Sequence, residues 1–559
     1  MTKKKDLELP WWKKTVVYQI YPRSFFDSNG DGIGDLKGII SKLDYIEELG
    51  IETIWFSPFF SSPQKDFGYD VSDFTDIDPA YGDIKICDEL IDEIHKRDMK
   101  IVLDLVLNHT SDQHPWFIES RSSRDNQKRD WYIWRDGRGK RPPNNWHSMI
   151  GGSGWHYDKK TDQWYWAQFL PFQPDLNYRN PEVKDTMFDM LRFWLRKKVD
   201  GFRLDIINAI YEDAELRNNP PSLRLIPSDT STSRLFKSSK YTVDHPDTFE
   251  FVKEIRKVID EFCNPPRFMV GEIVADMATA KKYCGERADG LNTVFLFKSL
   301  RTPHQAEKLR KLIETYEKYF HEPFIPTWVF ANHDRMRRIS RIGNDMEKAK
   351  LHAAFQLTVR GVPYIYYGEE IGIEHPRFIQ KESLDEMALK YKWIPQFVFD
   401  VIRKIGVESF NRDESRTPMQ WDASPNAGFC PSDVTPWLPV TSSYKERNVY
   451  IEMKNPDSIY NCYKRFLKIR KEIPALNAGS LEILKLEKAP KKLLGYVRTA
   501  SIGRKEQKAY VFLNFDKKPV SFSNPVVGAK FLASTCHNGN PVKNEKIVLK
   551  TQEGVVLLQ

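Results

Sequence analysis

Arg203 and Asp205 are charged residues within a short apolar run, Asp200 to Asn208, that is otherwise typical of one buried strand. Burying a charge costs free energy unless an opposite charge pairs with it. Because residues two apart on a strand point to the same face, the Arg203 guanidinium can partner the Asp205 carboxylate. The two residues are then either a structural ion pair or an active-site carboxylate that an arginine keeps ionised.

More acids and histidines follow other apolar runs, and the whole set is Asp104, Asn108, His109, Arg203, Asp205, Glu272, His333 and Asp334. If Asp205, Glu272 and Asp334 meet at one place without matching positive charge, the arrangement is costly unless the protein uses it. The two histidines could indicate a metal site. HxH and HExxH spacings are absent, however, so the indication is weak, and each histidine could equally be an ordinary core residue.

Apolar runs alternate with stretches of helical periodicity along most of the chain. Strands are expected at 16–22, 53–58, 101–109, 201–206, 267–273, 292–297, 327–334 and 363–370. Helices are expected at 36–49, 84–98, 181–198, 248–262, 303–319 and 345–359. The alternation predicts an α/β protein with a (β/α)8 TIM barrel, in which the carboxyl ends of the strands build the site.

A barrel of this kind needs about 250 residues, so a chain of 559 residues must contain further domains. Residues 109–178, rich in Trp, Gly, Pro and Asn, predict an inserted domain after strand 3. Beyond the helix at 458–473, short alternating runs predict an antiparallel β-sandwich domain. The expected organisation is a barrel at 1–108 and 179–479, the inserted domain at 109–178, and the C-terminal β domain at 480–559.

The composition of the chain limits the kinds of partner and the compartment that can be expected. The net charge is +8, and no Lys/Arg block beyond Lys3-Lys4-Lys5 suggests a nucleic-acid footprint. The six cysteines form no CxxC pair, which favours a reducing compartment. The N-terminus lacks an apolar core, and no 18-residue apolar run occurs. We expect a cytoplasmic protein, monomeric or a small homo-oligomer, without a nucleic-acid or membrane partner.

Five short motifs occur in a fixed order, and together they resemble the signature regions of the α-amylase superfamily of glycoside hydrolases. They are DLVLNH (104–109), QPDLN (173–177), GFRLD (201–205), GE (271–272) and NHD (332–334). The likeness runs from VVYQIYPRSF (16–25) to RTPMQW (416–421). With GYDVSDF (68–74), it is greatest to the oligo-1,6-glucosidase and α-glucosidase group.

The resemblance implies an exo-acting, retaining α-glucosidase that removes terminal non-reducing glucose from short oligosaccharides. Asp205 would be the nucleophile, with Arg203 keeping it ionised, and Glu272 would be the general acid and then the general base. Retaining enzymes hold these two carboxyl groups about 5–5.5 Å apart. Asp334 would stay ionised and bond the sugar hydroxyls.

The resemblance also implies the residues that bind the terminal glucose. They are Tyr69 as a stacking platform, Asp70 and Arg416 closing the far end, His109 and His333 bonding hydroxyls, Phe169 as an aromatic wall, and Gln173 of the QPDLN motif. Arg412 competes with Arg416 for its role, and Phe169 could be plain packing.

Linkage preference depends on Ile206, the residue after the expected nucleophile. In the resembling enzymes a β-branched residue here tends to accompany acceptance of α-1,6 bonds, and Ala tends to accompany α-1,4 preference. Ile206 therefore favours isomaltose-type substrates. Tyr178 stands where Trp is common, and segment 213–225 is more like α-glucosidases of broader preference. Maltose and sucrose are therefore retained as alternative substrates.

DSNGDGIGD, residues 27–35, is a Gly-rich acidic turn. It offers side-chain oxygens at Asp27, Asn29, Asp31 and Asp35 and a backbone carbonyl at Ile33, which is Ca²⁺ chemistry. The twelfth residue is Gly38 where an EF-hand needs Glu, so the loop is not an EF-hand. The resemblance implies a structural Ca²⁺ here, and the alternative is an acidic surface turn.

Two other functions use the same fold. In a sucrose isomerase or trehalose-synthase type of glucosyl transferase, a sugar intercepts the glucosyl-enzyme in place of water. The basic segment NHDRMRRISR (332–341) keeps that alternative open. The non-catalytic heavy chain of amino-acid transporters has a membrane span and usually lacks the carboxylates. It is disfavoured because the carboxylates are present and an apolar span is not.

Overall fold

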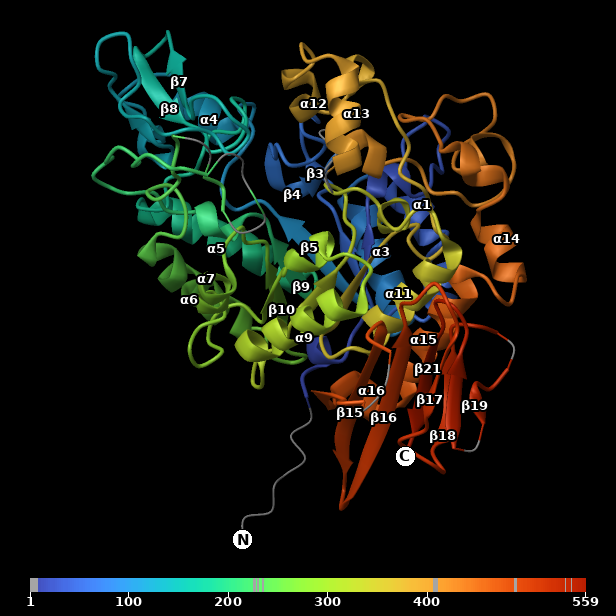
Figure 1. The fold of residues 1–559 in the computed structure, drawn as a ribbon. Coiled ribbons are helices and arrows are strands. Elements are labelled where there is room, and N and C mark those ends of the chain that lie inside the picture. Colours follow the sequence, from blue (N-terminus) through green and yellow to red (C-terminus); the bar gives the residue numbers. More distant parts are fainter. Residues whose placement is uncertain are drawn as a thin grey trace. The chain divides into compact units, whose positions relative to one another are not determined.

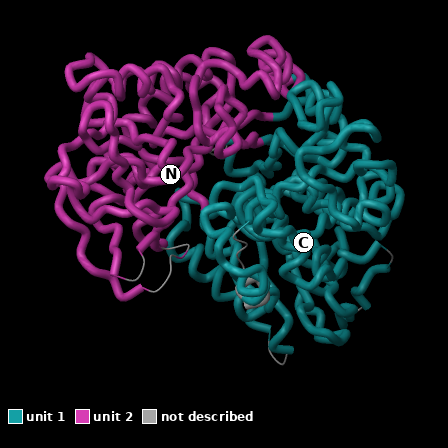
Figure 2. The backbone as a smooth tube through the Cα atoms, turned by 90° about the horizontal axis from the view of Figure 1, so that it is seen from above, with its two compact units in different colours: residues 1–54, 96–99, 296–559 teal, residues 55–95, 100–295 magenta. Residues whose placement is uncertain are grey.

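The computed structural model describes residues 9–224, 228, 231–233, 236–405, 411–486, 490–537, 539–543 and 545–559. The lysine run at 3–5 and the last residue of segment 213–225 lie outside the described residues. The chain forms two compact units (Figure 2). Unit 1 holds residues 1–54, 96–99 and 296–559, and unit 2 holds residues 55–95 and 100–295.

The barrel strands are β1 Val17–Ile20, β2 Thr53–Phe56, β5 Lys100–Leu105, β9 Gly201–Leu204, β10 Phe268–Gly271, β11 Thr293–Val294, β12 Thr327–Val329 and β13 Val362–Tyr366. The other strands are β3 Phe60–Ser61, β4 Asp73–Ile77, β6 Trp134–Arg135, β7 Trp155–Asp158, β8 Gln163–Trp166, β14 Ser480–Ile483, β15 Leu493–Ile502, β16 Lys505–Asn514, β17 Val520–Ser523, β18 Lys530–Ser534, β19 Val542–Lys543, β20 Lys546–Leu549 and β21 Gly554–Leu558.

The helices are α1 Leu36–Ile40, α2 Leu43–Leu49, α3 Ile84–Lys96, α4 Pro115–Ser120, α5 Pro181–Arg196, α6 Pro246–Asp260, α7 Met277–Lys282, α8 Lys298–Arg301, α9 Ala306–Phe320, α10 Arg338–Arg341, α11 Met346–Thr358, α12 Glu386–Lys390, α13 Gln396–Ile405, α14 Val449–Lys454, α15 Ile459–Glu472 and α16 Pro474–Ala478. Short 3-10 helices lie at 11–13, 22–24, 129–131, 207–209, 380–382, 412–415, 425–428 and 442–445.

The eight barrel strands form one sheet in the order β11-β10-β9-β5-β2-β1-β13-β12. This order is that of the chain, with the last two strands wrapped round to the start, and the recorded pairs are parallel. Consecutive strands separated by helices and paired in parallel are the arrangement of a (β/α)8 barrel. The predicted fold class is therefore confirmed. Six strands lie within the ranges expected from the sequence, and β5 and β13 begin one residue before theirs, at Lys100 and Val362.

The strands are shorter than their apolar runs. The expected strand at 327–334 ends at Val329, and the expected strand at 101–109 ends at Leu105. In both cases the chain leaves the sheet before the last polar residues of the range, and Asn108, His109, His333 and Asp334 lie in the connections that follow the strands. Polar side chains at the carboxyl ends of barrel strands are where a TIM barrel builds its site.

The outer helices begin with local caps that the sequence encodes. Asn180 caps α5 by accepting a hydrogen bond of 2.9 Å from the Glu182 N–H, and Pro181 occupies the first turn, where its missing N–H costs nothing. Asp345 caps α11 in the same way through the Lys348 N–H at 3.1 Å. Caps of this kind set where each helix starts, and so set the length of the connection before it.

The excursion after β5 contains a three-stranded sheet in the order β6-β8-β7. Its core is Ile133, Trp146, Trp155 and Trp166, with the Trp155 ring 5.5 Å from the Trp166 ring, centroid to centroid. Three of the Trp residues in this Trp-rich segment therefore form a small hydrophobic core within it.

The C-terminal part, drawn in red in Figure 1, has a five-stranded sheet in the order β14-β15-β16-β21-β18 and a three-stranded sheet in the order β17-β20-β19. Every recorded pair is antiparallel, as predicted. Residues from both sheets share one apolar core, including Phe512 and Leu557 from the larger and Phe522 and Ile547 from the smaller.

Two buried arginines bind the carboxyl end of α11, within unit 1. Arg470, on α15, donates to the carbonyls of Leu357 at 2.9 Å and Gly361 at 2.6 Å. Arg498, on β15, donates to the carbonyl of Thr358 at 2.7 Å. The last carbonyls of a helix have no partner within the helix, and the helix dipole makes that end attractive to cations. Elements that follow the eighth barrel strand thus complete the end of a barrel helix.

All six cysteines are free thiols, in agreement with the absence of paired spacings in the sequence. Among the residues that the structure describes, no helix is both long and apolar enough to cross a bilayer.

Candidate active site

The predicted site residues fall into two groups that lie in different compact units, so each group is described by itself. The Arg203 cluster, in unit 2, is Asp104, Arg203, Asp205 and Glu272. The Asp334 cluster, in unit 1, is Gln19, His333, Asp334 and Arg416.

One buried guanidinium holds the Arg203 cluster together. Arg203 is 1% exposed, and its Nη1 lies 2.6 Å from Asp104 Oδ1 and 2.6 Å from Asp205 Oδ1. Its Nη2 contacts Glu272 Oε2. The contact predicted between Arg203 and Asp205 is confirmed, and the same side chain also brings Glu272 to this point.

Asp104 is the member of this cluster for which no role was predicted from the sequence. It lies opposite Arg203 in the register of β5 with β9. Trp55 Nε1 and the Tyr69 hydroxyl donate to its Oδ2 at 3.3 and 3.2 Å. Asp104 therefore binds the same guanidinium nitrogen, Nη1, as Asp205 does. Its position in the DLVLNH motif was the available signal.

Burial raises the pKa of Asp104 to about 7, against the attraction of Arg203, which lowers it. Burial alone would lower the pKa of Arg203, but Asp104, Tyr69 and Asp205 together raise it above its ordinary value. Three carboxyl groups share a single guanidinium, so the cluster has acidic groups in excess of cations. Such a cluster can hold and release a proton near neutral pH.

Ile206 lies in the left-handed region, with φ 31° and ψ 50°. A β-branched side chain is rarely found there, and such a conformation costs about 1–3 kcal/mol. Hydrogen bonds hold the turn on both sides: Asp205 N–H donates to Leu105 O at 2.9 Å, and Ile207 N–H donates to Glu272 O at 3.1 Å. The hydrogen bond from Ile207 therefore ties the backbone just after Asp205 to the backbone of Glu272.

The backbone carbonyl of Tyr69 is held by two of the motifs. His109 Nε2 lies 3.0 Å from this oxygen, and Gln173 Nε2 lies 3.4 Å from it and 3.0 Å from Asp66 Oδ2. Burial lowers the pKa of His109 to about 4, so the imidazole is neutral and donates its Nε2 proton to the carbonyl. His109 and Gln173 thus position Tyr69. Their contacts with sugar hydroxyls stay predictions.

Asp70 is fully buried beside this loop. Its carboxylate accepts hydrogen bonds from Ser62 Oγ at 2.9 Å and from the N–H groups of Lys65 and Asp66 at 3.0 Å. Burial raises its pKa to about 6. The predicted pairing of Asp70 with Arg416 stays a prediction.

Phe169 is half-buried, and its ring centroid lies 5.2 Å from that of His109. This placement beside a predicted sugar-binding residue is compatible with an aromatic wall. Its role as a wall stays a prediction.

Arg416 is the nearer arginine in the Asp334 cluster. Its Nη2 lies 2.9 Å from Asp334 Oδ1, whereas Arg412 Nη1 lies 3.7 Å away. Arg412 is instead held by Asp385, at 2.6 and 2.9 Å. Burial alone would lower the pKa of Arg416, but Tyr21 and Asp334 help to raise it above its ordinary value. Arg416 is therefore the arginine that binds Asp334 more closely, and its role in closing the far end of the sugar site stays a prediction.

Gln19, which the sequence did not single out, orients His333. The Gln19 amide nitrogen lies 2.8 Å from His333 Nδ1 and can only donate, so Nδ1 accepts and the ring proton is on Nε2. That Nε2 lies 3.2 Å from Asp334 Oδ2. The Tyr21 ring stacks on the imidazole with 6.0 Å between centroids. The polar residue within VVYQIYP was the available signal.

Two further buried acids lie near the inserted sheet. Asp175 of the QPDLN motif accepts from the Gln168 N–H at 2.9 Å, and Glu212 accepts from Trp166 Nε1 at 2.9 Å. Burial raises the pKa of Glu212 to about 8. Burial and the charge of Glu212 raise that of Asp175 well above its ordinary value. The pair therefore keeps a proton at neutral pH.

Glu212→Gln is expected to flatten the pH dependence of stability. Because the folded pKa of Glu212 lies above the free value of about 4, the folded state binds the extra proton and the free energy of unfolding falls as the pH rises toward about 8. Urea unfolding midpoints from about pH 5 to about pH 9 measure this slope in both proteins. Glu119→Gln, an exposed glutamate on α4, is the matched control. A Glu212→Gln slope equal to that of the control would contradict the shared proton.

The turn at 27–35 is closed by its own backbone. Asp27 accepts hydrogen bonds from the N–H groups of Asn29, Gly30 and Gly32 at 3.1, 2.7 and 2.8 Å, and Asp35 caps α1 through the Gly38 N–H at 2.7 Å. Among the described residues, no three His, Cys, Asp or Glu side chains are gathered so that they could hold a metal ion. The carboxylates as arranged therefore do not form a ready site, and Ca²⁺ at this turn stays a prediction.

Comparison with known proteins places these features in one family. Residues 19–479 match the model of the alpha amylase catalytic domain. The chain is 40% identical over 547 residues to an oligo-1,6-glucosidase of Parageobacillus thermoglucosidasius, with 93% of each chain covered. It is 40% identical over 508 residues to a probable alpha-glucosidase of Rhizobium meliloti, with 88% and 87% covered.

Solved structures of other enzymes also resemble this chain along almost its whole length. An alpha-glucosyl transfer enzyme, XgtA, superposes with a TM-score of 0.87 at 34% identity, and the trehalulose synthase MutB of Pseudomonas mesoacidophila superposes with 0.86 at 32% identity. Each comparison covers 99% of this chain and 100% of the other. With the barrel, the ordered motifs and a family model that matches most of its length, the chain belongs to the α-amylase family of glycoside hydrolases.

Proposed function

We propose that this chain is an exo-acting, retaining α-glucosidase that hydrolyses the terminal non-reducing glucose of short α-linked oligosaccharides, with a preference for isomaltose-type substrates. The relatives named oligo-1,6-glucosidase and alpha-glucosidase support the reaction class. A cytoplasmic location and a monomeric or small homo-oligomeric state stay predictions.

The observation that carries the proposal is the sharing of the Arg203 guanidinium by Asp205 and Glu272. The two carboxyl groups contact neighbouring terminal nitrogens of one planar group. This supports the close spacing of retaining enzymes, about 5–5.5 Å, against the about 6.5–9.5 Å that an inverting enzyme needs to admit a water molecule.

In the first step, an Asp205 oxygen forms a bond to the anomeric carbon while the glycosidic oxygen leaves with its electron pair. Glu272 gives that oxygen its proton. In the second step, the Glu272 carboxylate takes a proton from water, whose oxygen bonds the anomeric carbon as Asp205 leaves. Arg203 favours the ionised form of Asp205 between turnovers, and Asp334 bonds the sugar hydroxyls more tightly as the ring gains positive charge.

Initial rates on isomaltose, maltose, sucrose and trehalose, with proton NMR of the first glucose released, test this proposal. We expect α-glucose as the first product, the highest kcat/KM on isomaltose, and negligible release from long polymers. First release of β-glucose would contradict retention, and rapid cleavage inside polymers would contradict exo action.

Glucosyl transfer is the second candidate function, because the structures of XgtA and the trehalulose synthase superpose closely on this chain. The basic segment at 332–341 supports glucosyl transfer less in the structure than its sequence suggested. Arg337 and Arg338 are buried, with Arg337 Nη1 donating to Tyr367 O at 2.8 Å and Arg338 Nη1 to Thr302 O at 3.1 Å. These side chains bind the fold's own carbonyls. On sucrose, glucose and fructose support hydrolysis, whereas an isomeric disaccharide would favour the transferase.

Ile206→Ala is expected to lower the ratio of kcat/KM on isomaltose to kcat/KM on maltose by about tenfold, which is about 1.4 kcal/mol of transition-state discrimination. The physical reason is that a methyl-sized side chain removes β-branched bulk directly after Asp205. Paired initial rates on the two disaccharides measure the ratio. Ile207→Ala, in the adjacent buried position, is the control for general damage. An unchanged ratio would remove Ile206 from linkage selection.

For the turn at 27–35 we propose a structural Ca²⁺ held by oxygens of Asp27, Asn29, Asp31 and Asp35 and the carbonyl of Ile33. We expect Ca²⁺ to raise Tm relative to chelator-treated protein, because a ligand that binds only the folded state stabilises it. Asp31→Ala, at an exposed position, should abolish the shift. Equal Tm values with Ca²⁺ and with chelator would leave the turn as an acidic surface loop.

A further inference from the structure

A basic pocket lies within unit 1, away from the Asp334 cluster, where the start of α9 and the segment 341–348 approach loops of the C-terminal β domain. Its volume is about 640 Å³, within the usual range for small-molecule sites of about 300–1,000 Å³. Its charged lining is Arg341, Lys348, Lys491, Lys492, Lys517 and Glu307. Five cations therefore face one carboxylate.

The surrounding ion pairs do not remove this excess. Lys348 pairs with Asp345 at 3.3 Å, Lys492 pairs with Asp516 at 3.1 Å, and Glu307 is itself bound by Lys311 at 3.0 Å. Lys491 and Lys517 form no ion pair among the described residues. Their two ammonium groups are therefore available to a ligand of opposite charge.

Polar side chains with unpartnered nitrogen atoms lie in the lining and beside it. His352 is 2% exposed and neither of its ring nitrogens has a hydrogen-bond partner, and Arg338 is 5% exposed with Nε and Nη2 unpartnered. His304, in the lining, donates its Nε2 proton to Gln552 Oε1 at 2.7 Å, so its Nδ1, which has no partner, is an acceptor. A buried polar group without a partner costs about 1–3 kcal/mol. Of these three residues His304 lines the pocket, so its Nδ1 can accept a hydrogen bond from a hydroxyl group of a ligand there.

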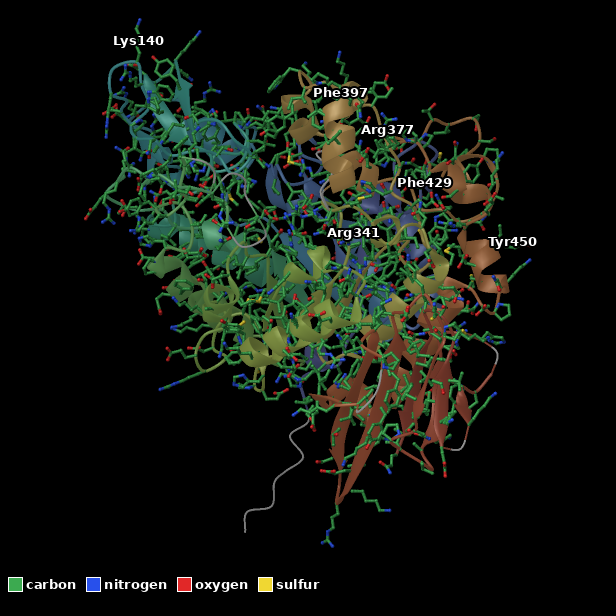
Figure 3. The ribbon with its side chains drawn as sticks, in the orientation of Figure 1. Lys140, Arg341, Arg377, Phe397, Phe429 and Tyr450 are labelled. Atoms are coloured by element: carbon green, nitrogen blue, oxygen red, sulfur yellow. The ribbon has the colours of Figure 1, made fainter. Side chains whose placement is uncertain are left out.

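The start of α9 adds to the positive electrostatic potential of the pocket. Gln305, at the N-cap, makes no side-chain hydrogen bond to the first turn of this 15-residue helix. Gln305, Ala306 and Glu307 all line the pocket. The N–H groups and the dipole of a helix start attract anions. Arg341, labelled in Figure 3, contributes through its position: its guanidinium is fixed by the carbonyls of Met336, Leu300 and Phe330.

We infer that this pocket binds a small organic phosphate, with the phosphate group among the lysines and the organic part against Phe515 and Ile342. The volume is too large for one inorganic phosphate. The Phe515 ring, 4.8 Å from the His304 ring between centroids, and the Ile342 side chain give an apolar wall that an inorganic ion would not use. Arginine and lysine recognise phosphate through charge-assisted hydrogen bonds.

The test measures binding of glucose 6-phosphate and of pyrophosphate by calorimetry at constant ionic strength, because surface charge effects are screened by salt. The variant is Lys491→Gln with Lys517→Gln. The matched control is Lys505→Gln with Lys546→Gln, two exposed lysines of the same domain that lie outside the pocket. Both double variants change the net charge by the same amount.

We expect the wild type and the control to bind glucose 6-phosphate at millimolar or lower concentration, and the pocket variant to bind it at least about tenfold more weakly. Weaker binding of pyrophosphate than of glucose 6-phosphate supports the apolar wall. Equal affinity in all three proteins, equal loss in the control, or no binding to the wild type would overturn the inference. Because none of these lysines belongs to the proposed catalytic set, glucosidase activity is an independent measurement.

Discussion

Asp205→Asn is expected to lower kcat by at least about 10⁴-fold while the protein stays folded. Asn has nearly the same size and can still accept a hydrogen bond from Arg203 Nη1, but its amide oxygen is not a nucleophile that forms a stable glycosyl ester. Arg203 also retains Asp104 and Glu272 as partners, so the cluster keeps its framework. Steady-state rates on isomaltose, with Tm from calorimetry, measure both parts of the prediction.

Companion variants separate the nucleophile from the acid–base group. Glu272→Gln should slow disaccharide cleavage by about 10²–10⁴-fold but should hardly slow the first step on a substrate whose leaving group needs no proton. Added azide should give the α-glucosyl azide with Glu272→Gln and the β-glucosyl azide with Asp205→Gly. Asp189→Asn, on the exposed side of α5, is the control. Turnover by Asp205→Asn within tenfold of the wild type would remove Asp205 from the nucleophile's role.

Arg203→Met is expected to lower the free energy of unfolding by about 3–5 kcal/mol at neutral pH, because it leaves buried carboxylates without their cation. Met has a similar length and no charge, so the loss reports on electrostatics more than on volume. The substitution should also abolish activity, since Asp205 and Glu272 lose the group that joins them. Denaturant unfolding followed by circular dichroism measures the change.

The loss caused by Arg203→Met should grow with pH. Burial already raises the pKa of Asp104 to about 7, and Arg203 opposes that rise. Without Arg203 the pKa rises further. A folded pKa above the free value of about 4 means that the folded state binds more protons, so stability falls as the pH rises between the two values. The variant should therefore be least impaired near pH 5 and most impaired above about pH 8.

Arg192→Met is the matched control for Arg203→Met. Arg192 also contacts two carboxylates, Asp189 at 3.0 Å and Glu261 at 2.7 Å, but it lies at the surface. Surface pairs contribute about 0–1 kcal/mol. The two variants could lose similar stability, or the loss in Arg203→Met could be independent of pH. Either result would show that burial does not determine how much Arg203 contributes to the free energy of unfolding.

The sequence could predict the barrel because each of its units carries a local signal. Strand runs such as 201–206 and helices such as α5, with Asn180 and Pro181 at its start, are encoded over a few residues. The contact between Arg203 and Asp205 was predictable for the same reason, since residues two apart on a strand share a face.

Partners on different strands could not be predicted in this way. Asp104 meets Arg203 only through the register of β5 with β9, and Gln19 meets His333 through the fold of unit 1. The left-handed conformation of Ile206 runs against the preference of its own side chain, so no local rule would assign it. The raised pKa of a buried acid such as Glu212 could not be predicted from the local sequence either, because the residues that bury it come from elsewhere in the chain.

The arginines at the carboxyl end of α11 have a consequence for how the protein is made. A ribosome synthesises the chain from its N-terminus, so all eight barrel strands leave the exit tunnel before Arg470 and Arg498 do. Until then the last carbonyls of α11 lack the donors that bind them in the native state, and the nascent barrel exposes an unfinished helix end. Messages truncated after the barrel codons would thus yield a polypeptide with the proposed catalytic residues but without the native end of α11, a substrate for chaperones and proteases.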